Sequence, residues 1–360
     1  MDIKKVALGM SGGVDSSAAA IILKNKGFEV LGTTLCLFDG NLPINGEFSP
    51  TQISEDALSA KVVCERLGIK HTLIDGRKEF YNHVIKDFAD GYYLGGTPNP
   101  CIVCNKKIKF GFMVNAALKL GCQGVATGHY ARIEKQGDRF LLKKAKDISK
   151  DQSYVLYCLD KEILSRVEFP LGEYTKEEIR AIARGAGLIN AERKDSQDIC
   201  FVPDGDYAAF LERLKGEKYP QGDYVDKMGN YLGKHQGVIN YTIGQRKGLG
   251  IALGKPQFVL SKDAQLNRVV LGDEEGLFYK KVLIEDVNFS AIDSLISPLR
   301  AKVKLRYRHT ESPATLHPMG EKEILVEFDE PQRAPSNGQA AVFYDGDIVL
   351  GGGIIKEGVL

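Results

Sequence analysis

The sequence lacks long hydrophobic runs, an excess of charge of either sign, and closely spaced cysteines in the numbers a disulfide framework needs. No apolar stretch reaches the roughly 18 residues of a membrane-spanning helix. The 48 Lys and Arg residues balance 47 Asp and Glu residues, which argues against nonspecific coating of nucleic acid. No signal peptide is evident at the N-terminus. We therefore expect a cytoplasmic protein with no membrane partner, whose seven cysteines are thiols.

The composition that remains is typical of a folded, multidomain protein. The chain has 360 residues, of which 43% are hydrophobic and 26% charged. At roughly 150 residues per domain, this length suggests two or three domains. Local signals also mark helix starts: Ser54 is a typical N-cap, and Thr175 with Glu178 has the spacing of a capping box.

The hydrophobic pattern changes along the chain. Up to about residue 130, apolar strands alternate with amphipathic helices, which predicts an α/β fold with a doubly wound parallel sheet. Residues 131–143 read as a hairpin. From about residue 265, short β-type segments separated by Gly and Pro predict an antiparallel β-barrel. We predict a catalytic α/β domain, a small central domain and a C-terminal β-barrel domain, at residues 1–205, 206–275 and 276–360.

The strongest single motif is Gly9-Met10-Ser11-Gly12-Gly13-Val14-Asp15-Ser16-Ser17, between a predicted strand and a predicted helix. Its glycines let the backbone approach a charged group, its serines supply hydroxyl donors, and the following helix directs free N–H groups at the loop. The motif is neither a Walker A sequence nor G-x-G-x-x-G. We predict a cradle for an anion; the alternative is a glycine-rich turn without a ligand.

The order Ser-Gly-Gly-Val-Asp-Ser-Ser resembles the PP-loop of the ATP pyrophosphatases, and we call residues 9–17 the PP-loop. Those enzymes cleave ATP between the α- and β-phosphates and transfer AMP to an oxygen. The resemblance implies an adenine nucleotide alpha hydrolase-like fold, with ATP and Mg²⁺ as cofactors. It also implies that Asp15 positions the magnesium or the phosphates. The residues implied to hold the pyrophosphate portion are Gly9, Met10, Ser11, Gly12, Gly13, Val14, Asp15 and Ser16.

Three of the cysteines lie in segments that indicate reactivity. Cys101 and Cys104 form a Cys-x-x-Cys pair at a predicted loop-to-helix junction, next to Lys106 and Lys107. A helix N-terminus and nearby cations stabilise a thiolate, so we expect lowered pKa values here. Cys200 stands alone further along the chain. The pair could also be thioredoxin-like or half of a zinc site, although no second close pair supplies the other ligands.

Several segments, in matching order along nearly the whole chain, resemble the bacterial tRNA-specific 2-thiouridylase family. They are Thr97-Pro98-Asn99-Pro100, Cys104-Asn105-Lys106 with Ile108-Lys109-Phe110, Ala126-Thr127-Gly128-His129-Tyr130, Lys150-Asp151-Gln152-Ser153-Tyr154, residues 195–201 and residues 241–248. The resemblance implies ATP-dependent 2-thiolation of the wobble uridine of tRNA. The carbon-2 oxygen is adenylated, and sulfur then comes from a persulfide on Cys200, with Cys104 as the nucleophilic partner thiol. The implied partners are tRNA, a cysteine desulfurase or sulfur-relay protein, and a reductant for the resulting disulfide.

The same resemblance implies the binding residues. Leu35 and Gly128 border the adenine. The target base contacts Asn99, Pro100 and Cys101, and the tRNA contacts Lys150, Asp151, Gln152, Arg306 and Tyr307.

The tRNA surface on the barrel also has a pattern of its own. Basic and apolar residues alternate from Arg300 to Arg308, so a strand would place five basic side chains on one face. Tyr307 could stack on a nucleotide. The alternative is an ordinary solvated strand face. We expect this surface to lie apart from the PP-loop.

One departure leaves the mechanism open. The best-known bacterial members have Asp where this sequence has Cys101. Cys101, Cys104 and Cys200 could hold an iron–sulfur cluster with one open iron, as in related PP-loop thiolases, and a persulfide on Cys200 would then not be needed. Two remoter alternatives are a PP-loop amide-forming synthetase, which needs no cysteines beside its substrate, and a non-catalytic RNA-binding module, which leaves the cysteines unexplained.

Overall fold

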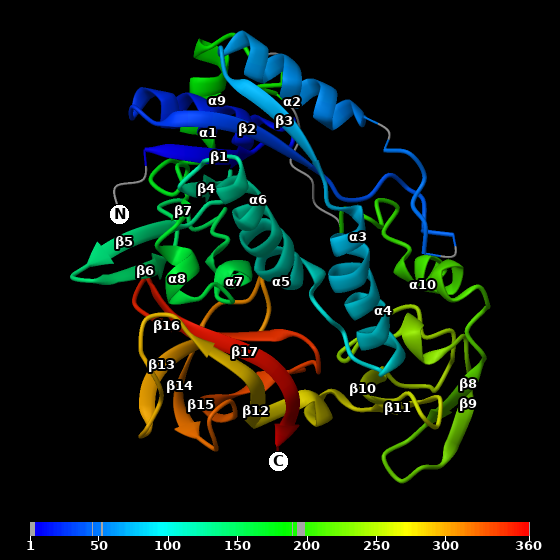
Figure 1. Cartoon of the computed structure of the whole chain (residues 1–360). Helices are drawn as coiled ribbons and strands as arrows, with labels where there is room; N and C mark the ends of the chain where they lie inside the picture. Colours follow the sequence, from blue (N-terminus) through cyan, green and yellow to red (C-terminus); the bar gives the residue numbers. More distant parts are fainter. Residues whose placement is uncertain (1–3, 45, 52, 189, 193–198, 360) are drawn as a thin grey trace.

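The computed structural model describes residues 4–44, 46–51, 53–188, 190–192 and 199–359. Its N-terminal part is a parallel sheet built from β1 (Lys5–Gly9), β2 (Glu29–Cys36), β3 (Lys70–Asp75), β4 (Gly124–Ala126) and β7 (Val167–Glu168). The strand order is β3-β2-β1-β4-β7 (Figure 1). The order reverses between β1 and β4, and ligands of such sheets bind at the carboxyl ends of the strands on either side of this reversal.

Helices cover both faces of this sheet. They include α1 (Val14–Asn25), α2 (Glu55–Arg66), α9 (Lys176–Gly185), α6 (Met113–Lys119), α7 (Ser153–Leu156) and α8 (Lys161–Leu164). Val6 and Leu8 of β1 pack with α1, α2 and α9, whereas Ala7 between them packs with α6 and α7. Successive residues of one strand thus enter different cores, and the prediction of a doubly wound sheet is confirmed. The predicted Ser54 cap and the Thr175–Glu178 capping box are also present.

Two longer helices each contain a π-helical stretch. One consists of α3 (Arg77–Phe80), η1 (Tyr81–Ile85) and α4 (Lys86–Tyr93). The other consists of α5 (Pro100–Val103), η2 (Cys104–Phe112) and α6. This second helix begins at Pro100, so both cysteines of the Cys-x-x-Cys pair lie within the helix. The reason is local: the Asn99 side chain accepts the N–H of Cys101 at 3.1 Å, and proline suits a first helical position.

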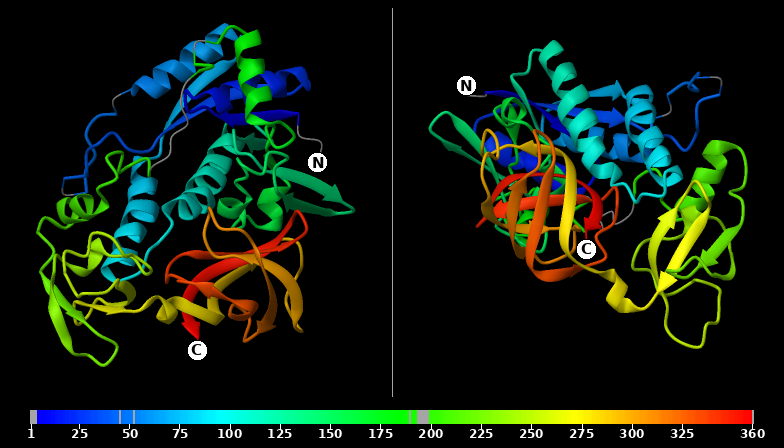
Figure 2. Two further views of the ribbon diagram at one scale, coloured as in Figure 1. Left: turned by 180° about the vertical axis from the view of Figure 1, so that it is seen from behind. Right: turned by 90° about the horizontal axis from the view of Figure 1, so that it is seen from below.

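The central part of the chain begins with α10 (Tyr207–Lys215) and forms a four-stranded sheet. Its elements are β8 (Gly222–Val225), β9 (Tyr231–His235), η3 (Val238–Asn240), β10 (Phe258–Asp263) and β11 (Arg268–Gly272). The order is β10-β11-β8-β9. In Figures 1 and 2 this sheet lies beside the C-terminal barrel, and both lie below the parallel sheet.

The C-terminal part is a closed antiparallel barrel, as predicted. Its elements are η4 (Glu274–Leu277), β12 (Phe278–Phe289), β13 (Leu299–Lys304), β14 (Ser312–Pro318), β15 (Ile324–Arg333), β16 (Ala340–Asp345) and β17 (Ile348–Val359). The order is β12-β15-β14-β13-β16-β17, and β12 also pairs with β17, which closes the barrel. The barrel contacts the N-terminal part of the chain at α7, where the Tyr154 hydroxyl donates to the Ala340 carbonyl at 2.8 Å.

The hairpin predicted at residues 131–143 is present as β5 (Arg132–Gln136) and β6 (Arg139–Lys143). It does not join the parallel sheet. Lys143 pairs with Ile348 of β17, so the hairpin extends the barrel sheet. The β5–β6 hairpin, from the first half of the chain, is thus part of the same sheet as the C-terminal barrel.

The prediction of a strand from residue 300 to 308 with five basic side chains on one face is wrong. β13 ends at Lys304, and the chain then turns before β14 begins at Ser312. Arg300 also faces a partner, because its guanidinium forms two 2.8 Å hydrogen bonds with the Asp329 carboxylate. The Asp329 carboxylate therefore offsets the positive charge of Arg300.

No helix in the described part of the chain has the length and hydrophobicity of a membrane span.

Candidate active site

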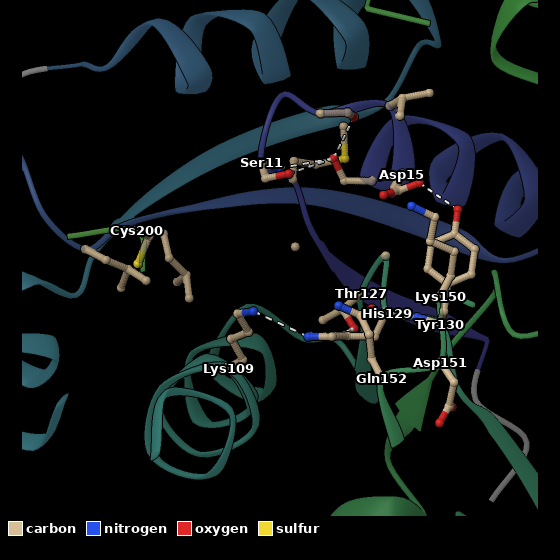
Figure 3. Close-up of a pocket in the computed structure, with 18 of the residues that line it drawn as sticks. Ser11, Asp15, Lys109, Thr127, His129, Tyr130, Lys150, Asp151, Gln152 and Cys200 are labelled. Carbon is tan, nitrogen blue, oxygen red and sulfur yellow. Dashed lines mark hydrogen bonds between the residues drawn. The ribbon is translucent and has the colours of Figure 1, made fainter. Parts of the chain in front are cut away.

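A cavity of about 1450 Å³ opens at the carboxyl ends of β1, β2 and β4 and extends to the barrel. The PP-loop forms one wall and Cys200 lies on another, across from Lys109 and His129 (Figure 3). The barrel contributes Lys302, Lys304, Tyr307 and Arg308 to the same cavity. The expectation that the basic barrel surface lies apart from the PP-loop is therefore wrong. The end of β13 and the turn that follows it bring this basic surface to the cavity that the PP-loop lines.

The PP-loop is shaped by its own hydroxyl groups. The Ser11 N–H donates to the Ser16 hydroxyl at 3.2 Å, and the Ser17 hydroxyl donates to the Gly13 carbonyl at 2.9 Å. Gly12 has a φ of +71°, and a Cβ there would lie 2.5 Å from the Asp56 carbonyl oxygen. Gly12 therefore cannot carry a side chain without distorting the loop.

The two residues predicted to border the adenine both line the cavity: Leu35 at the end of β2, and Gly128 just after β4. Gly128 packs directly on the PP-loop, since a Cβ at this position would lie 3.0 Å from the Ser16 nitrogen. The close approach explains the need for glycine.

Asp15 has partners that the sequence did not reveal. Both of its carboxylate oxygens lie 2.8 Å from the Lys176 ammonium, and the Tyr130 hydroxyl donates to one of them at 2.8 Å. Lys176 is the first residue of α9, while Asp15 lies in the first turn of α1. The ion pair thus ties the start of α1 to the start of α9, beside the predicted phosphate site. Tyr130 lay within a recognised motif, but nothing local marked Lys176.

The three singled-out cysteines occupy different environments. Cys104 is buried at the start of η2, whereas Cys101 and Cys200 retain exposed surface. Surrounding protein atoms nevertheless exclude much of the solvent from all three thiols. This desolvation raises the pKa of Cys101 and Cys104, and it raises the pKa of Cys200 to about 12 with further contributions from the charges of Cys104 and Cys101. The three thiols are therefore electrostatic neighbours, but the predicted lowering of the pKa of Cys101 and Cys104 is wrong.

The cation that acts on these thiols is Lys109. Its charge lowers the pKa of Cys101, Cys104 and Cys200 against the larger effect of desolvation. Lys106 and Lys107, which the sequence suggested for this role, are exposed and do not line the cavity. The helical period explains the difference, because Lys109 lies five residues after Cys104 within a π-helical segment, where i and i+5 are hydrogen-bonded neighbours.

Lys109 also contacts a buried histidine that sequence analysis left without a role. Its Nζ lies 3.4 Å from His129 Nε2, and His129 Nδ1 lies 2.6 Å from the Thr127 hydroxyl (Figure 3). Burial lowers the pKa of His129 well below its ordinary value, so the ring is neutral near pH 7. A neutral ring accepts the lysine N–H at Nε2 and leaves its Nδ1 proton for Thr127.

No group of three His, Cys, Asp or Glu side chains within the described residues is arranged to hold a metal ion. Cys101, Cys104 and Cys200 are all described, and they do not form such a group for a single ion. Residues 195–198, part of the segment that carries the resemblance around Cys200, lie outside the described residues.

The residues predicted to contact tRNA divide into two groups. Lys150, Asp151, Gln152 and Tyr307 line the cavity. Asp151 also has a structural role: its carboxylate accepts from the Ala145 N–H at 2.9 Å and from the Ser153 hydroxyl at 2.7 Å. Tyr307 is 39% exposed.

Arg306 does not line the cavity. Its Nη2 donates to the Ala334 carbonyl at 2.8 Å, the Ser336 hydroxyl at 3.0 Å and the Ile243 carbonyl at 3.4 Å. It therefore joins the barrel to the central segment.

The residues predicted to touch the target base lie together at the start of the second long helix. Asn99 caps α5, Pro100 is buried, and Cys101 is in the first turn of the helix. None of them lines the cavity.

Matches to known proteins cover the whole chain. Residues 4–204 match the tRNA methyl transferase HUP domain family, residues 208–273 the tRNA methyl transferase PRC-barrel domain family, and residues 279–355 the aminomethyltransferase beta-barrel domain family. The tRNA-specific 2-thiouridylase of Clostridioides difficile (strain 630) is 48% identical over 98% of both chains. That of Acetivibrio thermocellus is 47% identical over 99% of this chain and 100% of the relative.

A solved 4-thiouridine synthetase in complex with RNA and bound ATP is 20% identical, with a TM-score of 0.36 over 58% of this chain and 50% of the other. The identity to the full-length relatives is decisive: the chain belongs to the tRNA-specific 2-thiouridylase family.

Proposed function

We propose that this protein is an ATP-dependent tRNA-uridine 2-sulfurtransferase acting in the cytoplasm on the wobble uridine. The observation that carries the proposal is the shared cavity, which brings together the PP-loop, the Cys200 thiol and the basic turn after β13. An ATP site, a sulfur carrier and a surface for a polyanion are the three things that this reaction requires.

Activation is the first step. The carbon-2 oxygen of uracil is a poor leaving group, and transfer of AMP from ATP to this oxygen releases pyrophosphate and corrects that. The PP-loop would hold the leaving pyrophosphate through its N–H groups and hydroxyls. Mg²⁺ would screen the phosphate charges when bound. The carboxylate within the PP-loop, Asp15, is paired with Lys176. We therefore assign Asp15 primarily to positioning the loop and secondarily to binding Mg²⁺.

Sulfur transfer is the second step. The terminal sulfur of a Cys200 persulfide attacks carbon 2, and AMP leaves with the original oxygen. The Cys104 thiolate then attacks Cys200 Sγ, forms the Cys104–Cys200 disulfide and breaks the bond to the transferred sulfur, which stays on the base as the thiocarbonyl. A cysteine desulfurase or relay protein supplies the persulfide, and a reductant resets the disulfide. The charge of Cys104 contributes to the raised pKa of Cys200, which supports the proximity of the two thiols.

The iron–sulfur alternative gains no support from the arrangement of the described residues. We therefore derive no step through a cluster, and the persulfide route is our proposal. We also propose the division at residues 1–205, 206–275 and 276–360, which is supported by the ranges of the three matched families.

The test is single-turnover thiolation of unmodified tRNA after anaerobic purification, with iron and acid-labile sulfide measured on the same sample. Iron-free protein should form 2-thiouridine when given ATP, a desulfurase, cysteine and a thiol reductant, and pyrophosphate release should depend on tRNA. Thiolation that occurs only in iron-loaded protein would overturn the persulfide route. Pyrophosphate release with no 2-thiouridine under either condition would overturn the proposed function.

A further inference from the structure

The loop at residues 94–99 joins α4 to α5 and leads directly into the segment predicted to touch the target base. It contains Gly95 and Gly96, which leave its backbone conformationally free. Within its own part of the chain, the Gly96 N–H donates to the Gly91 carbonyl at 2.9 Å. Pro98 also packs on Gly91, where a Cβ would lie 2.8 Å from the proline ring. The Leu94 and Gly95 N–H groups donate to the Asp90 and Tyr92 carbonyls at 2.9 Å each. The Gly96 carbonyl and both backbone groups of Thr97, in contrast, have partners from distant parts of the chain.

The barrel supplies two of these contacts through the turn at residues 337–339, between β15 and β16. The Thr97 N–H donates to the Asn337 carbonyl at 2.8 Å, and the Gln339 side chain donates to the Thr97 carbonyl at 2.6 Å. Both backbone groups of Thr97 are thus satisfied by the barrel. Gly338 has a φ of +84°, and a Cβ there would lie 3.1 Å from the Thr97 nitrogen, so the contact requires glycine.

The turn is itself held firmly by β17. The Asn337 side chain donates to the Lys356 carbonyl at 2.9 Å. The Gly338 N–H donates to the Ile355 carbonyl at 3.0 Å, and the Ile355 N–H donates to the Gln339 carbonyl at 2.7 Å. The loop therefore rests on a part of the barrel that is fixed on its other side.

The central sheet supplies the next contact. Lys262 of β10 donates from its Nζ to the Gly96 carbonyl at 3.1 Å, with its ammonium 5.9 Å from the centre of the Tyr92 ring. Burial lowers the pKa of Lys262 to about 8. A half-buried lysine whose ammonium donates to the Gly96 carbonyl thus connects the central sheet to this loop.

We propose that Lys262 and the turn at residues 337–339 are positioning elements for sulfur transfer: together they fix the loop at residues 94–99, and through it the start of the helix that carries Cys104. The barrel and the central sheet would then set the position of the Cys104 thiol, which adenylation at the PP-loop does not use. This inference rests on the proposed function. Small misplacements of reacting groups cost large factors in rate, so the effect should fall on turnover and not on binding.

The test compares Lys262→Met, which removes the donor but keeps the length of the side chain, with Lys262→Arg, which restores a donor. Lys218→Met is the matched control, because Lys218 is an exposed lysine of the same central region. In Lys262→Met we expect the single-turnover thiolation rate to fall about tenfold, with ATP affinity, tRNA affinity and tRNA-dependent pyrophosphate release within twofold of wild type. Lys262→Arg should recover part of the rate, and Lys218→Met should behave as wild type.

Hydrogen exchange gives a readout independent of activity. Amides of residues 95–101 should exchange faster in Lys262→Met and in Gly338→Ala, while those of residues 9–20 stay unchanged. Wild-type thiolation together with wild-type exchange in Lys262→Met would overturn the proposal, as would a proportional loss of pyrophosphate release, which indicates general damage. If the wild-type protein makes no 2-thiouridine, the proposed function fails. Unchanged exchange at residues 95–101 in both variants would separately refute the positioning role of Lys262 and the turn at residues 337–339.

Discussion

Replacing Arg306 with alanine should lower the stability of the junction between the barrel and the central sheet, and should not remove a direct contact with tRNA. Arg306 Nη2 makes two short hydrogen bonds, to Ala334 at 2.8 Å and Ser336 at 3.0 Å, and a longer one to Ile243 at 3.4 Å. Ala334 and Ser336 are almost fully buried, so water cannot freely replace the guanidinium. Each hydrogen bond from a charged donor contributes about 1.5–3 kcal/mol.

The expected loss is smaller than the sum of these contributions. The Ser336 hydroxyl also donates to the Ala334 carbonyl at 3.2 Å, so that acceptor keeps one partner in the variant. We therefore expect Arg306→Ala to lower the free energy of unfolding by about 2–3 kcal/mol. At roughly 2 °C per kcal/mol for a chain of this size, the melting temperature should fall by about 5 °C.

The assay pairs thermal melting with the salt dependence of tRNA binding. The matched control is Arg308→Ala, two residues further on, where an exposed arginine lines the cavity. Arg308→Ala should melt as wild type but reduce the log–log salt slope by about one, as for one lost phosphate contact. A wild-type melting temperature for Arg306→Ala together with a slope reduced by about one would refute the reasoning, and Arg306 would be a phosphate contact as the family resemblance implies.

Three further predictions follow from the site. Asp15→Ala should abolish tRNA-dependent pyrophosphate release and also lower the melting temperature, because its carboxylate holds a lysine and a tyrosine; retained release in folded protein would contradict the PP-loop assignment. Cys104→Ser and Cys200→Ser should each lose thiolation but keep adenylation, measured as pyrophosphate release, and a wild-type thiolation rate in Cys200→Ser would exclude the persulfide role. Lys109→Gln should shift the pH profile of Cys200 alkylation to higher pH, because the lysine charge lowers that thiol's pKa. The exposed Lys107→Gln should leave the profile unchanged, and equal profiles in both variants would contradict the role of Lys109.

Local features of this protein were predictable from its sequence. The PP-loop, the Ser54 cap and the Thr175 capping box depend on residues within a few positions of one another, so their chemistry can be read directly from the chain. The continuous apolar run Val6-Ala7-Leu8 of β1 likewise predicted a strand buried on both faces, because successive side chains of a strand point to opposite faces of the sheet. The family resemblance then assigned Cys104 and Cys200, which lie 96 residues apart in the sequence, to the same reaction as the PP-loop.

The tertiary structure decided which side chains meet across long separations and where regular elements end. Lys176 reaches Asp15 over 161 positions and Lys262 reaches Gly96 over 166, and nothing local to either lysine marks its partner. The alternation of basic and apolar residues continues past Lys304, but β13 ends there because β14 must return antiparallel from Ser312 and a turn has to fit between them. That turn carries the basic side chains to the PP-loop cavity, and it sends Arg306 into the junction of barrel and central sheet.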